Sequence, residues 1–439
     1  MTPEKIGIVG FGYIGCTIGA VLAERGHEVV GIDSNTALID TVRAGKSPFN
    51  EPGLEELIAC SVGAGRLGVA QDYAALAACD VVLVTVGTPL SDDGVADLTQ
   101  IRKAAEQMAP HLRDGQLVIL KSTVPPTTTS AVVQPILRAR ADVLLAFCPE
   151  RLAEGNAIRD LKSIPVVVGG VDERSTEASA GFWRRALGIE VITVASDRAA
   201  EMVKLADNLW IDLNIALANE LAKLCDKFGL DVLQVIDAAN TLPKVGYNVN
   251  ILVPSLGVGG YCLTKDPWFV HRMGQDMGLE LETPKTSRRI NDGMPDYAVS
   301  LIDEALLKDG ARAGDLEIAV LGIAFKTNTG DCRFTPTKPA IEALQRRGYR
   351  LRICDPYVRT EDALSVTQVP LTQDIETAVG GADCVAFFTG HDVFKAFAIE
   401  RLAELAKPGA LVFDGRMFFP REAIGRIESL GLRYKGVGR

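Results

Sequence analysis

The sequence predicts an α/β protein in which two parallel-sheet lobes, one at each end of the chain, are joined by a long central helix and a helical middle domain. Apolar runs of strand length alternate with helical patterns over residues 1–195, and the same alternation returns from about Glu317. Between these lobes, residues 199–230 predict one helix, about 48 Å long at the usual helical rise. Strands that alternate with helices favour parallel sheets covered on both faces.

The N-terminal lobe begins with a strand over Lys5–Val9, which a glycine-rich loop connects to a helix ending near Arg25. A second strand, over Glu28–Ile32, is followed directly by Asp33. Further apolar runs predict three more strands, at Val81–Val86, Leu117–Leu120 and Val143–Ala146. Because helical segments separate these strands, their connections are crossovers of the kind that parallel strands require.

Residues 240–268 differ from both lobes because they are rich in Gly, Pro and Asn. This composition predicts a loop of special backbone conformations, and such loops often hold functional residues. The C-terminal lobe then begins with a strand over Ile318–Leu321 and a helix over Pro339–Arg347. Its further strands are predicted at Tyr349–Cys354, Val385–Phe388 and Ala410–Phe413. We therefore expect three domains, over residues 1–195, 196–300 and 301–439.

Composition and charge exclude several classes of protein. The net charge is −10, from 46 basic and 56 acidic residues, which argues against a nucleic-acid binder or a polybasic membrane protein. The nine cysteines form no C-x-x-C pair and the four histidines are dispersed, so we expect a reduced intracellular protein without a metal site. No signal peptide or membrane-spanning run is visible, and a cytoplasmic location is expected.

A G-x-G-x-x-G string formed by Gly10, Gly12 and Gly15 follows the first strand and opens the first helix. The first glycine permits a tight turn, the second lets a pyrophosphate approach the backbone, and the third lets the helix pack on the sheet. Asp33 can accept hydrogen bonds from a ribose 2′-hydroxyl and would repel a 2′-phosphate. The sequence therefore predicts an NAD site rather than an NADP site, with FAD as an open alternative.

Cys262 differs from the other cysteines because it lies in the glycine-rich segment Gly257–Pro267. Most cysteines in such a chain are small buried hydrophobes. Here Lys265 would favour the thiolate and Asp266 could accept protons or order water, which points to a nucleophile.

Lys204 and Asn208 are four residues apart on the predicted central helix and share one face of it. Their spacing alone leaves open whether that face is solvated or functional.

Together these residues resemble the UDP-glucose/GDP-mannose dehydrogenase family over nearly the whole chain. The matching motifs are Gly10–Gly15 with Asp33, Ser47–Gly53, Val86–Pro89, Lys121–Pro125, Pro149–Gly155, Lys204 with Asn208, Gly257–Pro267, Ala324–Lys326 with Asn328 and Thr329, Asp331–Arg333, and Asp414–Arg416. The resemblance implies an NAD-binding Rossmann domain over residues 1–195, a central dimerisation domain with the cysteine loop over 196–300, and a UDP-sugar-binding Rossmann-like domain over 301–439.

The resemblance also implies a reaction, the four-electron oxidation of the C6 hydroxyl of a nucleotide sugar to a carboxylate. Two NAD and one water are consumed, and the cysteine forms a thiohemiacetal and then a thioester with the sugar carbon. The implied catalytic residues are Cys262, Lys204, Asn208, Asp266, Glu154 and Thr123. The implied cofactor contacts are Gly10, Gly12, Tyr13, Ile14, Gly15, Asp33, Thr88, Thr123 and Arg333. The implied substrate contacts are Glu150, Arg151, Leu152, Lys204, Asn208, Asn250, Gly259, Phe325 and Lys326.

The expected substrate follows the branch of the family that the chain resembles most. The segments Pro149–Arg151, Asp212–Glu220 and Asp266–Trp268 resemble the UDP-N-acetylhexosamine branch, so UDP-N-acetyl-D-mannosamine or UDP-N-acetyl-D-glucosamine is favoured. Tyr261 departs from that branch, in which a histidine often precedes the cysteine. A UDP- or dTDP-glucose 6-dehydrogenase is the alternative.

Two other functions are compatible with the nucleotide-binding pattern. A two-electron hydroxyacid-type dehydrogenase would release one NADH per substrate, and an NAD-binding protein without activity would release none. We also expect a homodimer through the central helix, because of its length and its apolar residues around Ala216, Leu217 and Leu221.

Overall fold

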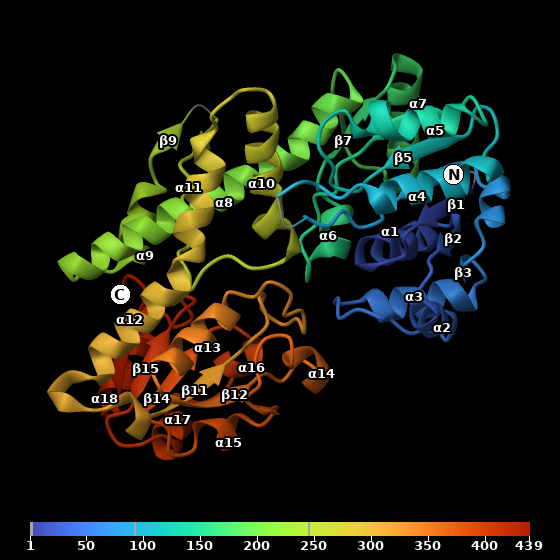
Figure 1. The fold of residues 1–439 in the computed structure, drawn as a ribbon. Coiled ribbons are helices and arrows are strands. Elements are labelled where there is room, and N and C mark those ends of the chain that lie inside the picture. Colours follow the sequence, from blue (N-terminus) through green and yellow to red (C-terminus); the bar gives the residue numbers. More distant parts are fainter. Residues whose placement is uncertain (1–2, 92–93, 245) are drawn as a thin grey trace. The chain divides into compact units, whose positions relative to one another are not determined.

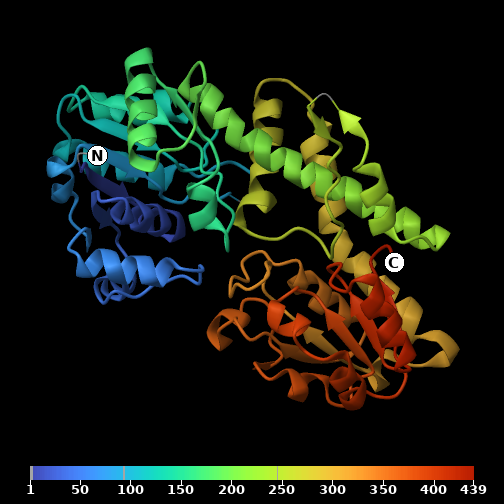
Figure 2. The same cartoon turned by 180° about the vertical axis from the view of Figure 1, so that it is seen from behind.

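The computed structural model describes residues 3–91, 94–244 and 246–439 (Figures 1 and 2). The chain divides into two compact units, one ending at Asp207 and the other beginning at Asn208. The boundary falls within helix α8 (Asp197–Phe228), which agrees with the long helix expected over residues 199–230.

The first unit is built on an eight-stranded sheet in the order β3-β2-β1-β4-β5-β6-β7-β8. Its strands are β1 (Lys5–Val9), β2 (Glu28–Ile32), β3 (Leu67–Ala70), β4 (Val81–Val84), β5 (Leu117–Leu120), β6 (Leu144–Phe147), β7 (Val166–Gly170) and β8 (Val191–Thr193). Its helices are α1 (Tyr13–Glu24), α2 (Thr36–Arg43), α3 (Leu54–Gly63), α4 (Thr99–Met108), α5 (Gln134–Arg138), α6 (Ala157–Leu161) and α7 (Glu173–Leu187). The first six strands have the order of a doubly wound dinucleotide-binding fold.

Strand β4 shows why the predicted runs of apolar residues form this sheet. Val81 and Leu83 belong to a core cluster with α1, α3 and α7, whereas Val82 and Val84 belong to a second cluster with α4 and α5. Successive side chains of a strand point to opposite faces, so a strand buried on both faces must be apolar throughout. One pairing differs from the expected parallel sheet, since β6 and β7 are antiparallel.

The second unit combines a helical part with a second sheet. The helical part contains the rest of α8, α9 (Val232–Ala239), the hairpin β9 (Pro243–Lys244) and β10 (Tyr247–Asn248), α10 (Tyr261–Asp276), α11 (Glu282–Asp292) and α12 (Met294–Leu306). The sheet, in the order β13-β12-β11-β14-β15-β16, contains β11 (Glu317–Leu321), β12 (Arg350–Cys354), β13 (Leu371–Thr372), β14 (Cys384–Phe387), β15 (Leu411–Asp414) and β16 (Arg433–Gly436). Its helices are α13 (Thr337–Arg346), α14 (Thr360–Ala363), α15 (Ile375–Val379), α16 (Asp392–Lys395), α17 (Ile399–Leu405) and α18 (Arg421–Ser429).

All five pairings of this second sheet are parallel, and its strand order repeats that of the first six strands of unit one. The prediction of two α/β lobes of similar design is thereby confirmed. Ala218 and Ala222 of α8, Met294 of α12 and Ile318 of β11 belong to one buried cluster, so the helical part and the second sheet share a core. The division into three domains stays a prediction.

The prediction of a loop over residues 240–268 is wrong at its C-terminal end, because helix α10 begins at Tyr261. Gly260, at φ +87°, precedes the first helical residue, and Pro267 lies inside the helix. Glycine and proline both favour a loop, but here Gly260 precedes the first residue of a helix and Pro267 is tolerated within it. Among the helices of the described residues, none has the length and apolar character needed to cross a membrane.

Candidate functional site

The first unit contains a cavity of about 620 Å³ at the carboxyl ends of β1 and β4, where the strand order reverses. Gly10, Gly12 and Asp33 line it. Gly10 has φ +85°, and a Cβ there would lie 2.9 Å from the backbone nitrogen of Val86. A Cβ on Gly15 would lie 2.3 Å from the carbonyl oxygen of Gly10, so that helix α1 could not approach the loop. Doubly wound folds bind nucleotides in this position.

Asp33 follows β2 and fixes the shape of the glycine-rich loop. Its carboxylate accepts hydrogen bonds from the backbone nitrogens of Phe11, at 2.8 Å, and Asn35, at 2.9 Å. The side chain is only partly buried and remains on the cavity wall. It can therefore still accept a hydrogen bond from a ribose.

Tyr13, in the first turn of α1, is connected to Glu51, which the sequence singled out only as part of a motif. The Tyr13 hydroxyl donates to Glu51 Oε2 at 2.5 Å, and burial together with this carboxylate raises the pKa of Tyr13. The backbone nitrogens of Gly155 and Ala157 donate to the same carboxylate at 2.6 and 2.8 Å. Glu51 thus holds the turn that contains Glu154, one of the predicted catalytic residues.

The loop after β5 contains Thr123, whose carbonyl oxygen accepts a hydrogen bond from Thr88 Oγ1 at 2.6 Å. Further along it, Thr127 has the left-handed φ of 82°. Glu201 of α8, which is fully buried, accepts from the backbone nitrogens of Thr127 and Thr129 at 2.6 and 2.8 Å. Burial raises the pKa of Glu201 to about 7. Glu201 therefore connects α8 to this loop, a role that no local sequence pattern indicates.

Glu150, Arg151 and Leu152 follow β6, where Glu150 is buried and Arg151 and Leu152 are partly exposed. Glu150 is 8% exposed, forms an ion pair with Lys121 at 3.4 Å and accepts from the backbone nitrogen of Leu152. Arg151 is paired with Asp207 at 2.9 Å. Their proposed contact with a substrate stays a prediction.

Cys262 lies in the first turn of α10 with an exposed side chain. One turn further, Asp266 is fully buried and its carboxylate is bonded by Asn208 Nδ2 and Lys265 Nζ, each at 2.5 Å. The Lys265 ammonium also lies 4.4 Å from the centre of the Phe269 ring, so its charge is directed to the interior and to Asp266.

Helix α8 brings Asn208 to this position, and Lys204 precedes it by one turn on the same helical face. Lys204 is half-buried. The bond between Asn208 and Asp266 therefore joins α8 to α10 at two of the predicted catalytic residues.

A cavity of about 610 Å³ in the second unit is lined by Gly259, Phe325, Lys326, Lys395 and Arg416 among others. Its walls include the segments that follow β11, β14 and β15, at the carboxyl edge of the second sheet. Burial lowers the pKa of Arg416 to about 10, and its guanidinium donates to the carbonyl oxygen of Phe325 at 3.2 Å. Three of the predicted substrate residues, Gly259, Phe325 and Lys326, are thus brought together around basic side chains that suit a phosphate.

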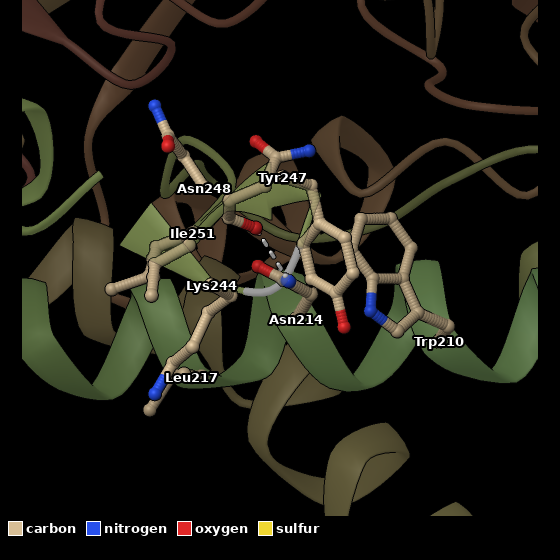
Figure 3. Close-up of a pocket in the computed structure, with 9 residues that line it drawn as sticks. Trp210, Asn214, Leu217, Lys244, Tyr247, Asn248 and Ile251 are labelled. Carbon is tan, nitrogen blue, oxygen red and sulfur yellow. Dashed lines mark hydrogen bonds between the residues drawn. The ribbon is translucent and has the colours of Figure 1, made fainter. Parts of the chain in front are cut away.

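Asn250, predicted to contact the substrate, and Arg333, predicted to contact the cofactor, do not line this cavity. The side chain of Arg333 forms an ion pair with Asp331. Asn250 lines a different cavity of about 750 Å³ beside α8, where its carbonyl oxygen accepts a hydrogen bond from Asn214 at 2.8 Å (Figure 3).

Asp355 follows β12 as Asp33 follows β2, but it is closed to ligands. It is fully buried and accepts from the backbone nitrogen of Ile323 at 2.8 Å and from His391 Nε2 at 3.1 Å. Burial opposes its negative charge, but the bonds to His391 and the backbone outweigh this and lower the pKa of Asp355. The second sheet therefore lacks an accessible acid for a ribose at this position, unlike the first.

Three domain models of one family match the chain in order. The NAD binding domain of the UDP-glucose/GDP-mannose dehydrogenase family matches residues 4–186, its central domain residues 198–293 and its UDP binding domain residues 319–421. A UDP-N-acetyl-D-mannosamine dehydrogenase of Methanococcus maripaludis is 32% identical over 94% of this chain and 92% of its own length.

Two solved structures are similar over nearly the whole chain. A UDP-D-ManNAc dehydrogenase from Pyrococcus horikoshii is 31% identical, with a TM-score of 0.88 over 99% of both chains. A UDP-glucose dehydrogenase from Pyrobaculum islandicum is also 31% identical, with a TM-score of 0.88 over 100% of this chain and 98% of its own. The resemblance inferred from the motifs is therefore confirmed, and the chain belongs to the UDP-glucose/GDP-mannose dehydrogenase family and is an NAD-dependent dehydrogenase.

Proposed function

We propose that this enzyme oxidises the C6 hydroxyl of a nucleotide sugar to a carboxylate, with Cys262 as the nucleophile. The observation that supports this most is the exposed position of Cys262 in the first turn of α10, one turn before Asp266, which Asn208 holds. The N-terminus of a helix presents partial positive charge, which favours a thiolate over a thiol.

The glycine-rich loop and Asp33 would hold the dinucleotide in the first-unit cavity, where it would supply the hydride acceptor for two successive oxidations of the sugar carbon. Lys204 stabilises the negative charge that develops on the C6 oxygen, and Asn208 helps to hold the same oxygen. Thr123 lies near the nicotinamide, and Glu154 transfers protons through water. These roles follow from the family motifs.

After the first oxidation, the Cys262 sulfur adds to the C6 aldehyde, forming a C–S bond while the carbonyl oxygen becomes a hydroxyl. Loss of the second hydride from that carbon leaves a thioester. Water, with Asp266 assisting proton transfer, then adds to the thioester carbon, and the C–S bond breaks to restore the Cys262 thiolate and release the acid. Each sugar consumes two NAD and one water.

The nucleotide is proposed to bind in the second-unit cavity lined by Lys326 and Arg416, where basic side chains can meet a diphosphate. We favour a UDP-N-acetylhexosamine as the substrate. UDP-N-acetyl-D-mannosamine is the first choice, because the M. maripaludis relative is named as a dehydrogenase of this sugar. UDP-glucose is the second candidate, because the P. islandicum structure is as similar as that of the P. horikoshii enzyme.

A panel of nucleotide sugars, read by NADH release and by mass spectrometry of the product, tests this proposal. We expect two NADH for each uronic acid formed, with the highest kcat/KM for a UDP-N-acetylhexosamine. One NADH per product would support the two-electron alternative and contradict the proposal. A preference for UDP-glucose at two NADH per product would keep the chemistry and correct the sugar.

We also propose that the enzyme is a homodimer through α8. Trp210, Leu213, Leu217 and Leu224 are exposed by 41–55% and recur at spacings that place them along one side of the helix. Figure 3 shows Trp210 and Leu217 beside a cavity that Tyr247 of the hairpin also lines. The structure corrects in part which residues form the apolar face that the sequence predicted.

Of the three residues expected on that face, only Leu217 is exposed. Ala216 is buried, and Leu221 packs against the core of the second unit. Trp210, Leu213, Leu217 and Leu224 therefore replace the residues that the sequence predicted for the dimer interface. An exposed apolar stripe of this kind is typical of an interface.

Light scattering at micromolar concentration is expected to give about twice the chain mass of 47.0 kDa. The double variant Leu213→Lys/Leu217→Lys should give the monomer mass, because it places two desolvated charges in the interface. Leu364→Lys, at a leucine that is 60% exposed away from α8, is the matched control and should leave the dimer intact. A monomer of the unsubstituted protein would overturn this part of the proposal.

A further inference from the structure

Two of the segments that indicate the N-acetylhexosamine branch, Asp212–Glu220 and Asp266–Trp268, contain buried residues for which the proposed chemistry has no use. Asp212 and Asn219 of α8 are fully buried, and Pro267 is buried inside α10. None of these three lines the nucleotide cavity of the first unit or either of the two cavities described in the second unit. Their role must therefore be sought in how they hold other residues.

Pro267 leaves one backbone carbonyl of α10 without its usual hydrogen-bond donor. In an α-helix, the carbonyl of Leu263 accepts a hydrogen bond from the backbone nitrogen four residues later, which here belongs to proline and has no hydrogen. A carbonyl that is shielded from water and lacks a donor is destabilising. Arg288 of α11 supplies one, since its Nη1 donates to the carbonyl oxygen of Leu263 at 3.3 Å.

The Arg288 guanidinium is itself held firmly, because only 1% of the residue is exposed. Its Nη1 forms an ion pair with Asp212 Oδ1 at 2.7 Å, and its Nη2 pairs with Asp292. The Asp212 carboxylate also accepts from Ser287 Oγ and Asn291 Nδ2, each at 2.8 Å. A buried charge pair with these additional bonds has little freedom to move.

The same network also reaches the other end of the glycine-rich segment. Asn291 Oδ1 accepts from Asn219 Nδ2 at 2.9 Å, and Asn219 Oδ1 accepts from the backbone nitrogen of Ser255 at 2.8 Å. Ser255 and Leu263 stand on either side of Cys262 in the chain. Asn219 of α8 thus binds one end of the segment that contains the thiol directly, and Asp212 of α8 holds the other end through Arg288 of α11.

We propose that Arg288 is a positioning residue for Cys262: its guanidinium replaces the backbone donor that Pro267 lacks and so holds the first turn of α10 in place. The importance of that turn for turnover rests on the proposed function, in which Cys262 is the nucleophile. Arg288 does not line the cavity that holds Lys326 and Arg416, and it acts on the first turn of α10 through the Leu263 carbonyl.

Hydrogen–deuterium exchange of the peptide over residues 261–266 tests this directly. Arg288→Lys keeps the charge beside Asp212 but removes the fork that reaches two acceptors, so exchange in this peptide should become at least about fivefold faster. Pro267→Ala restores a backbone hydrogen four residues after Leu263. Arg288→Lys should also lower kcat. In the double variant Arg288→Lys/Pro267→Ala, exchange in this peptide should therefore slow and kcat should rise, both towards the values of the unsubstituted enzyme.

Two further variants keep the test decisive if Arg288→Lys does not fold. Asp292 is largely exposed, and Asp292→Asn should raise exchange in the same peptide by loosening Arg288. Asp296→Asn, at an exposed aspartate of the neighbouring α12, is the matched control and should not. Unchanged exchange in both Arg288→Lys and Asp292→Asn, or no rescue by Pro267→Ala, would overturn the role of Arg288. Faster exchange with full uronic acid production would instead contradict the proposed function of Cys262.

Discussion

Cys262→Ser is expected to lower the rate of uronic acid formation by about 10³-fold or more, while NAD binding stays unchanged. A serine hydroxyl ionises far less readily than a thiol, and the start of α10 cannot compensate for that difference. Without the thiohemiacetal the second hydride transfer loses its substrate. The measurement is the yield of acid by mass spectrometry together with NAD affinity by calorimetry.

Cys60→Ser provides the matched control, because Cys60 is also exposed but lies in α3, where no role is proposed. We expect it to retain full activity. Free aldehyde released by Cys262→Ser would support covalent capture as the step that is lost. An unchanged yield of acid from Cys262→Ser would show that hydrolysis proceeds without this thiol.

Lys204→Met is expected to lower kcat for the first oxidation by about 10²–10³-fold, which is the usual effect of removing one group that stabilises an oxyanion. Methionine keeps much of the length and apolar contact of the half-buried lysine and removes its charge. The first hydride transfer should therefore slow, while the affinity for NAD remains. Single-turnover NADH formation measures this step separately from thioester hydrolysis.

Lys223→Met is the control for this variant, because Lys223 lies on the same helix and is also half-buried. Its ammonium lies over the Tyr297 ring at 5.3 Å, so its loss should affect stability by about 1 kcal/mol or less and not turnover. Should Lys204→Met and Lys223→Met react equally fast, Lys204 has no part in stabilising the oxygen.

The fold could be predicted wherever burial imposes a pattern on the sequence. Strands β4 and β5 are buried on both faces, and their unbroken apolar runs are visible without a structure. The outermost strand β8 was missed because two of its three residues are exposed. Strand β7 was also missed, since it ends in two glycines, and a Cβ on Gly169 would lie 2.1 Å from the carbonyl oxygen of Ser196.

The candidate site could be predicted where its chemistry is local in the sequence. Gly10–Gly15 and Asp33 meet within one strand–helix–strand unit, so their spacing suffices. Glu51, Glu201 and Arg288 could not be assigned roles, because their partners are distant in the chain. Glu51 bonds to Gly155, which is 104 residues away, and Arg288 bonds to Asp212, 76 residues away.

Acid quenching of a single turnover, followed by mass spectrometry of the peptide that contains Cys262, tests the central claim most directly. The enzyme should show a sugar-acyl adduct on this sulfur that rises with the second equivalent of NADH and decays as the acid appears. No adduct at any time in a reaction that yields two NADH per acid, or an adduct confined to Cys60, would contradict the covalent mechanism.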